Sequence, residues 1–272
     1  MTEPKPSPIL DNRRFVLLLA GLSIAWGVVI SGPQIDLMHK VQGLTLRYPD
    51  ELWRCFNIFG HFLGASFLLL ILTRKAIAVF SLALATVLGS LAIRLLKVNI
   101  DEVRPAALMP DDLHIIGETL SHHAMPSGHS MTIAIVFGLL LALDAMRPRQ
   151  SRPIAVLLSA MVIGVGLARV ASGAHWPADV LVGIGLGLAV GYLSGRLTLR
   201  QAHRLPHWDW LHPLCSLLLA LALLLTPLPP SHSMAASISL GMLLAFWQCR
   251  DSYRLSFHFL MKRKSPSMHA GS

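Results

Sequence analysis

Three short clusters of charged and polar residues interrupt a chain that is otherwise strongly apolar. In sequence order they are Lys97 to Arg104-Pro105, Pro126-Ser127-Gly128-His129, and Arg169 through His175 to Asp179. Guanidinium and ammonium groups bind phosphate oxygens, and a helix that begins near Ser127 would add free amide groups and the positive end of its dipole. Gly128 would let the backbone approach an anion closely, and the two histidines exchange protons near neutral pH. An anion site beside two imidazoles is suited to phosphoryl transfer.

The composition indicates that a membrane surrounds these clusters. Of 272 residues, 54% are hydrophobic and 14% are charged, whereas a soluble domain carries about 25% charged residues. The formal net charge is +9, but the basic residues stand in short groups between apolar runs, which favours membrane orientation over nucleic-acid binding. The three cysteines are scattered singly, so they predict neither a disulfide framework nor a zinc site.

Eight apolar segments are candidate membrane spans, since a bilayer core requires about 20 residues of helix. They cover residues 15–31, 55–73, 76–96, 130–146, 154–171, 178–196, 211–227 and 233–248. The first follows two arginines, which also suits a signal peptide, but no A-x-A cleavage signal follows and we expect an uncleaved helix. The last two are short and separated by three prolines, so a tight hairpin is the alternative to two full spans.

The basic residues predict an orientation. With the N-terminus in the cytoplasm, 16 of the 23 Lys and Arg residues fall on the cytoplasmic side and 7 on the other, as the positive-inside rule expects. All three polar clusters then lie at the outer face. The predicted parts are a cytoplasmic tail (1–14), a core (15–200), an additional C-terminal transmembrane hairpin (201–248) and a basic cytoplasmic tail (249–272).

Two outer loops and one glycine-rich span carry further expectations. Residues 32–54 mix apolar and polar side chains and predict an amphipathic stretch at the membrane interface. Residues 97–129 are too many for a simple connector. The glycines of the sixth span are expected to permit close helix packing; they are Gly183, Gly185, Gly187 and Gly191.

The patterns K-x6-RP, PSGH and R-x5-H-x3-D, in this order and each at a matching membrane end, resemble the three-part signature of the type 2 phosphatidic acid phosphatase superfamily. The resemblance covers about residues 55–196. It implies an all-α polytopic membrane helix bundle, with a six-helix phosphatase core plus two C-terminal hydrophobic helices. It also implies a metal-independent lipid phosphatase without cofactors, which acts through a phosphohistidine at the periplasmic or outer face of a bacterial inner membrane.

The resemblance assigns a role to each residue that matches the motifs. His175 is the expected nucleophile, Asp179 holds its imidazole, and His129 is the general acid and then the base. The expected phosphate-binding residues are Lys97, Arg104, Ser127, Gly128 and Arg169. The family commonly has Ser before the third-motif Arg, where this chain has Ala168. One hydrogen bond to phosphate is therefore expected to be missing, at a cost of about 1.5–3 kcal/mol.

Several alternatives stay open from the residues. Asp179 also suits the first turn of a helix that begins at Pro177, and both explanations hold together. His122 and His123 beside His129 could suggest a metal site, but their spacing argues against one. The substrate is expected to be a polyprenyl diphosphate or a glycerophospholipid phosphate, with lipid A phosphate also allowed.

Two other functions compete with the phosphatase. The same phosphohistidine would serve a lipid-to-lipid phosphotransferase. A non-catalytic transporter or scaffold belongs to a different class and would leave polar residues buried in mid-span, where this chain has few. The expected partners are a lipid phosphate and the bilayer, with no nucleic acid, and the sequence leaves the oligomeric state open.

Overall fold

The computed structural model describes residues 13–31, 34–73, 75–118, 120–143, 151–205, 208 and 210–263; the predicted tails beyond Arg13 and Arg263 lie outside them. Helices account for most of this part of the chain, which contains no strand. In chain order they are α1 (Arg13–Val29), α2 (Gln34–Thr45), α3 (Asp50–Gly60), α4 (Phe62–Leu72), α5 (Ala76–Asn99), α6 (Pro105–Leu108), α7 (Gly128–Ala142), α8 (Ser151–Ala171), α9 (Pro177–Arg200), the 3₁₀ turn η1 (Ala202–Arg204), α10 (Leu211–Leu225) and α11 (Met234–Arg263).

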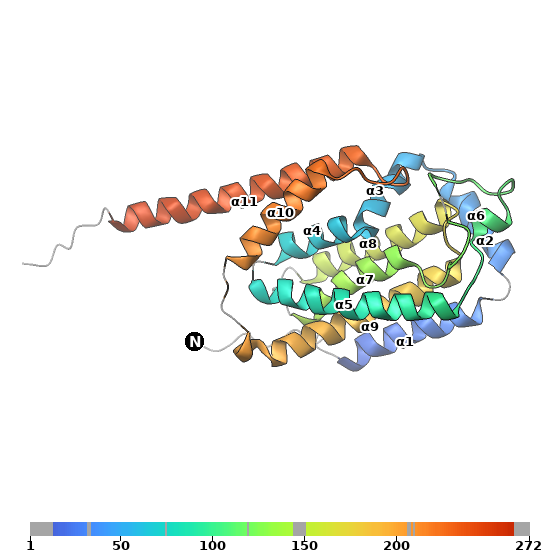
Figure 1. Cartoon of the computed structure of the whole chain (residues 1–272), viewed down its shortest axis with the longest axis horizontal. Helices are drawn as coiled ribbons and strands as arrows, with labels where there is room; N and C mark the ends of the chain where they lie inside the picture. The colour runs from blue at the N-terminus through green and yellow to red at the C-terminus, as the bar shows by residue number, and fades with distance from the viewer. Residues whose placement is uncertain are drawn as a thin grey trace, which may run out of the picture.

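Helix α7 lies at the centre of the bundle (Figure 1). It packs along α9 and also contacts α3, α4, α5 and α8, while α1 covers another side of α9. At one end of the bundle, which we call the loop end, lie α2, α6 and residues 100–127. The polar clusters of the sequence belong to this end, and the apolar helices hold it in shape.

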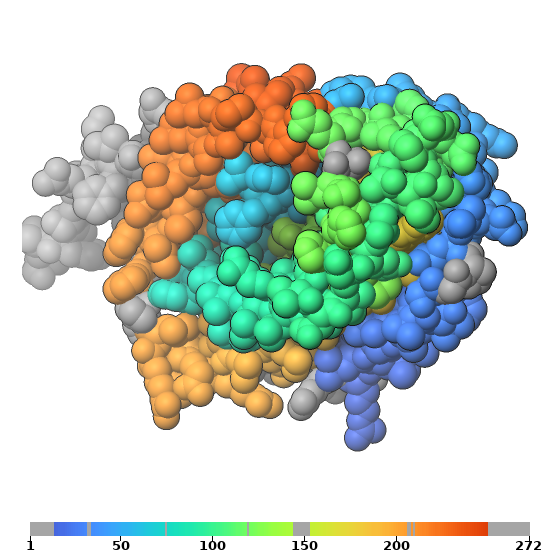
Figure 2. Space-filling model, turned by 45° about the vertical axis from the view of Figure 1, so that its right-hand side comes forward, coloured from blue at the N-terminus to red at the C-terminus, as the bar shows by residue number. Residues whose placement is uncertain are grey.

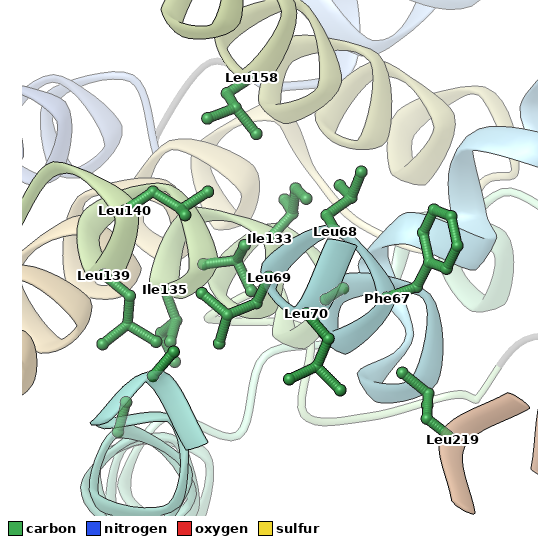
Figure 3. Packing of buried hydrophobic residues seen from close by; sticks show 14 of the residues in the cluster. Phe67, Leu68, Leu69, Leu70, Ile133, Ile135, Leu139, Leu140, Leu158 and Leu219 are labelled. Atoms are coloured by element: carbon green, nitrogen blue, oxygen red, sulfur yellow. The ribbon is translucent and has the colours of Figure 1, made fainter. Parts of the chain in front are cut away.

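The interior of the bundle is filled by aliphatic side chains from α4, α7 and α8 (Figure 3). Leu69, Leu139 and Leu140 are fully buried, and Leu158 joins them from α8. Helix α4 is apolar all round and buried from Gly64 to Leu70, as expected of a helix enclosed by others. In a membrane such packing is stabilised by van der Waals contact rather than by removal of water.

Glycines let α9 lie directly against two neighbours, as the sequence predicts. A Cβ atom at Gly183 would lie 2.5 Å from the carbonyl oxygen of Ser127, and one at Gly187 or Gly191 would strike the α7 backbone. Gly185 makes the same close approach to Ala20 of α1, at 2.5 Å. The α7–α9 contact matters for the site because these two helices carry His129 and Asp179 on their first turns.

The chain is an integral membrane protein with a polytopic helix bundle. In the described residues, three helices are long and apolar enough to cross a membrane: α5, α9 and residues 153–171 of α8. Two bent pairs, α1 with α2 and α3 with α4, raise the number to as many as five, and α7, α10 and residues 234–249 are shorter apolar helices. Exposed apolar side chains on these helices include Leu18, Leu91, Ile163, Leu221 and Phe246.

The structure corrects two predicted boundaries. The span predicted over residues 55–73 is not one helix, because α3 and α4 meet at His61 with a bend of 70°. His61 has extended backbone angles and its Nδ1 accepts the amide of Leu63, so it ends one helix and caps the next. Helix α11 continues past the predicted span to Arg263, through residues predicted as the basic tail.

The last two apolar segments form a hairpin. Helices α10 and α11 pack against each other, α10 also lies on α4 and α5, and α11 contacts α3. Their connection, residues 226–233, returns to the loop end, where the amide of Ser233 donates to the carbonyl of Arg54 at 3.3 Å. The hairpin therefore brings a second polar loop to the end of the bundle that holds the motif residues.

Candidate active site

The three polar clusters meet at the loop end. Lys97 lies in the last turn of α5, Arg104 immediately before α6, Ser127 and Gly128 at the start of α7, Arg169 in the last turn of α8, and His175 and Asp179 around the start of α9. Backbone hydrogen bonds fasten these elements to one another. The amide of Ser127 donates to the carbonyl of Asp179 at 3.0 Å, and that of Ala106 donates to the carbonyl of Gly173 at 3.0 Å.

His175 and Asp179 form a buried pair, with side chains 3% and 0% exposed. Asp179 Oδ2 lies 3.2 Å from His175 Nδ1 and accepts the backbone amide of Trp176 at 2.8 Å. An ionised carboxylate only accepts, so Nδ1 carries the proton and Nε2 keeps a lone pair. The same oxygen thus caps α9 and orients the imidazole, and both explanations of Asp179 hold together.

The free nitrogen of His175 faces a guanidinium group. His175 Nε2 lies 3.5 Å from Arg104 Nη1. Burial, reinforced by Arg169 and Arg104, holds the pKa of His175 well below its usual range. A neutral imidazole that is fixed through Nδ1 and open at Nε2 is equipped to act as a nucleophile.

The two arginines are almost wholly buried, and each keeps bonding capacity. Arg104 Nε donates to the carbonyl of His122 at 3.0 Å, and Nη1 donates to that of Ala174 at 3.1 Å. Arg169 Nη1 donates to Asn57 Oδ1 at 3.1 Å, while its Nε is buried without a hydrogen-bond partner. A buried cation with an unpaired donor requires an acceptor, and phosphate oxygens are suited to that role.

Lys97 and the start of α7 border the same space. The Lys97 ammonium donates to the carbonyl of His123, whose Nδ1 lies 2.9 Å from the carbonyl of Lys97, so α5 and the loop before α7 are fastened reciprocally. Ser127 is the N-cap of α7 and accepts the hydroxyl of Ser130 at 3.0 Å. The first amides of α7 have no carbonyl partner within the helix, as at any helix start.

His129 is bonded to a histidine from outside the three clusters. Its Nε2 lies 2.9 Å from Nε2 of His232, in the α10–α11 connection. The ring of His61, at the bend between α3 and α4, lies 5.4 Å from that of His232 and 6.4 Å from that of His129. Gly60 leaves room for this arrangement, because a Cβ atom there would lie 2.7 Å from that of His129.

Glu102 adds a second carboxyl group beside Asp179. The two carboxyl groups are within hydrogen-bonding reach of each other. Glu102 Oε2 and Asp179 Oδ1 are buried and have no other partner, whereas Glu102 Oε1 accepts Gln34 Nε2 at 3.2 Å. Two ionised carboxylates offer only acceptors, so one of them must keep its proton for the contact to form. Asp179 Oδ2 already accepts the Trp176 amide and lies against Nδ1 of His175, and such donors favour the ionised form of a carboxyl group. The geometry therefore favours Glu102 as the donor.

Sequence reasoning placed the motif residues but missed four of their partners: Gln34, Asn57, Glu102 and His232. Asn57 lies inside a predicted span, and Glu102 lies inside the first motif without an assigned role. For His232 a signal was available, since the predicted orientation puts the 227–233 loop on the same side as the motifs. In the sequence, however, His232 stands alone, with no other residue at a recognisable motif spacing, and nothing marked it as part of the site.

Three further residues that the sequence singled out have identifiable surroundings. Ala168 is fully buried in an apolar cluster with Trp53, Ile116 and Ala171. His122 and His123 lie 3.2 Å and 3.4 Å from Asp101. In the part of the chain that the structure describes, no group of three or more His, Cys, Asp or Glu side chains is arranged to hold a metal ion.

An apolar cavity of about 400 Å³ leads from His129 into the bundle between α4, α5 and α7. A second cavity of about 550 Å³ extends to α10 and shares Phe62, Ser66, Leu82 and Thr86 with the first, so the two adjoin. Figure 2 shows the corresponding hollow between α5 and α10, with α4 at its floor. The site thus meets, at Gly128 and His129, an apolar space that extends to the hollow between α5 and α10.

The sequence of this chain is also similar to those of known proteins. Residues 74–203 match the sequence model of the PAP2 superfamily. A lipid A 1-phosphatase of Rhizobium etli is 33% identical over a stretch that covers 53% of this chain and 64% of that protein. This chain therefore spans somewhat less than two thirds of the length of that relative.

Two solved structures are also similar. LpxE of Aquifex aeolicus is 21% identical, with a TM-score of 0.47, over 63% of this chain and 97% of that one. A transmembrane PAP2-type phosphatidylglycerolphosphate phosphatase from Bacillus subtilis is 22% identical, with a TM-score of 0.48, over 72% and 96%. The family match at residues 74–203 includes every residue of the three polar clusters, so the part of the chain that holds them is similar to the PAP2 superfamily.

Proposed function

We propose that this protein is a metal-independent lipid phosphatase that works through a phosphohistidine on His175. The observation that carries the proposal is the state of His175. Its Nδ1 is held by Asp179, and its Nε2 carries a lone pair beside Arg104. The imidazole is neutral because burial and the neighbouring arginines lower its pKa. Such a group attacks phosphorus readily once the arginines have drawn electron density onto the phosphoryl oxygens.

The reaction then runs in two displacements. In the first, Nε2 of His175 forms a bond to phosphorus, the bond from phosphorus to the lipid oxygen breaks, and His129 gives that oxygen its proton. In the second, His129 takes a proton from water, the water oxygen attacks phosphorus, and the P–N bond breaks to release inorganic phosphate. Lys97, Arg104, Arg169 and the start of α7 with Ser127 and Gly128 hold the phosphoryl oxygens throughout.

The apolar cavity favours a lipid as the substrate. It begins at His129, where the leaving group departs, and continues along α5 and α10. The hydrocarbon part of a lipid would lie there while its phosphate reaches the arginines. The name of the Rhizobium relative makes lipid A with a 1-phosphate the first substrate to test; phosphatidylglycerol phosphate and a polyprenyl diphosphate follow. We also propose that the site lies at the periplasmic face.

The test is phosphate release by purified protein from these three lipids and phosphatidic acid, with and without a chelator. His175→Ala is expected to lose at least a thousandfold in kcat, because the nucleophile itself is removed. His203→Ala, an exposed histidine in η1, is the matched control and should retain full activity. Failure of the wild-type protein to release phosphate from any lipid would refute hydrolysis. If phosphate then appeared on an added acceptor lipid, the site would be that of a phosphotransferase.

A further inference from the structure

The connection between α10 and α11 supplies a polar group that the motifs do not include. Ser231, His232 and Ser233 are 8%, 5% and 3% exposed, although they lie in a loop between two apolar helices. They stand outside residues 74–203, which match the family. Buried polar side chains in a membrane protein require partners, and those of this loop are found in the core of the site.

His232 is held in place from both sides. Its Nδ1 lies 3.1 Å from Ser231 Oγ, and the carbonyl of Ser231 accepts Asn57 Nδ2 at 2.9 Å. Asn57 also accepts Arg169 Nη1 through Oδ1, so one side chain fixes both the loop and a phosphate-facing arginine. A Cβ atom at Gly117 would lie 2.7 Å from the backbone nitrogen of Ser231, so the absence of a side chain there lets the two loops pack closely. These contacts leave Nε2 of His232 aimed at Nε2 of His129.

The contact of 2.9 Å between the two Nε2 atoms requires one proton between them. His232 is the acceptor when its own proton is on Nδ1, where Ser231 Oγ receives it. Burial, together with His61 and Arg169, lowers the pKa of His232 to about 4, so its ring is neutral at pH 7. In the tautomer with the His232 proton on Nδ1, the proton of the contact belongs to Nε2 of His129.

We propose that His232 is a positioning residue for the reaction: it accepts a hydrogen bond from Nε2 of His129, stabilises the protonated form of that histidine and leaves Nδ1 to exchange protons with the leaving oxygen and with water. The inference rests on the proposed function, since it assigns a partner to the general acid. Asp179 does the corresponding work for His175, with a carboxylate in place of an imidazole. The C-terminal hairpin thereby completes the acid–base machinery of the core.

The experiment compares substrates that need the acid with one that does not. An alkyl phosphate of a lipid leaves as an alkoxide and requires a proton, whereas p-nitrophenolate leaves unaided. His232→Ala is expected to lower kcat on the lipid about tenfold to a hundredfold, the usual effect of removing a hydrogen bond to a charged group. KM should stay within twofold, and the first burst of p-nitrophenolate from p-nitrophenyl phosphate should be unchanged.

The pH profile gives a second readout that a purely structural role would not move. The charged and titratable groups around His129 are Arg169 of α8, Arg104 before α6, His61 at the α3–α4 bend, and His232. All of these except His232 remain in His232→Ala. We expect the alkaline limb of the kcat profile of this variant to shift towards lower pH by about one unit. That shift measures the contribution of His232. His232→Gln retains an acceptor oxygen and should recover much of the activity.

The outcomes separate the two proposals. A wild-type protein without phosphatase activity, or one indifferent to His175→Ala, overturns both. Activity that depends on His175 but is unchanged in His232→Ala overturns only this inference. Equal losses on the lipid and aryl substrates, with an unshifted profile, also overturn it and indicate that His232 is structural. Thermal unfolding in detergent identifies a variant that does not fold; His232→Gln, closest in size, then decides through the same two readouts.

Discussion

Replacing Glu102 tests how the two carboxyl groups behind His175 share a proton. Asp179 uses Oδ2 for His175 and Trp176, and its Oδ1 is buried with no donor other than a protonated Glu102. Glu102→Ala removes that donor and leaves a buried carboxylate oxygen unpaired. A hydrogen bond to a charged group contributes about 1.5–3 kcal/mol, so kcat should fall roughly tenfold to a hundredfold as Asp179 loses its orientation.

Glu102→Gln is the matched comparison, since its amide donates to Asp179 without titrating. At pH 6 to 7 this variant should stay within about threefold of the wild-type kcat. The two variants therefore separate a need for the donor from a need for the carboxyl group. A Gln variant as impaired as the Ala variant at neutral pH would refute the shared proton, and an Ala variant with full activity would show that Asp179 needs no second partner.

Unfolding measurements at several pH values test the raised pKa of Glu102 independently of activity. Because burial raises the pKa of Glu102, its contribution to stability is fully present below its unfolded pKa of about 4.3 and is lost as the pH rises through its folded value. The wild-type protein should thus lose thermal stability relative to Glu102→Gln as the pH rises, and the two should converge in acid. Scans of the melting temperature from pH 4 to pH 9 measure this difference; parallel curves would contradict it.

Two further predictions concern the leaving group and its hydrocarbon. His129→Ala should lower kcat on a lipid phosphate at least a hundredfold yet preserve a burst of p-nitrophenolate from p-nitrophenyl phosphate, followed by slow turnover, because only dephosphorylation of His175 then needs the base; loss of the burst would place His129 in phosphate binding. Thr86→Trp should fill the cavity between α4, α5 and α7 and raise KM for long-chain substrates about tenfold or more, since each buried methylene contributes about 0.8 kcal/mol. Unchanged KM across a chain-length series would exclude this cavity as the lipid site.

The sequence predicted the helices and the motif residues for a simple physical reason. Apolar length identifies segments that must be helical in a bilayer, because every backbone group there needs an internal partner. Polar residues at one side of such segments then have only one surface on which to gather. The positions of Lys97, Arg104 and Arg169 at helix ends follow from these two constraints without any knowledge of side-chain packing.

What the sequence did not predict depends on packing in three dimensions. The residues on both sides of Gly60 and His61 are apolar, yet the chain bends there, since Gly60 lies close to the Cβ atom of His129 and His61 caps the next helix. Glu102 is one of several acidic residues in its loop, and the sequence gives no sign of its contact with Asp179. His232 is separated from His129 by 103 positions, and no local spacing links the two.

The unequal partners of the two histidines follow from the charges that each must carry. His175 begins neutral and becomes a positively charged phosphoimidazole, so an anionic acceptor at Nδ1 stabilises the state it moves towards. His129 must carry a proton when the lipid oxygen leaves and must release that proton to the oxygen. A carboxylate at its Nε2 would stabilise the protonated ring strongly and oppose that release, whereas the neutral ring of His232 fixes the orientation and leaves the proton acidic. The arginines and Lys97 already balance the phosphate, and a further anion beside His129 would weaken their hold on it.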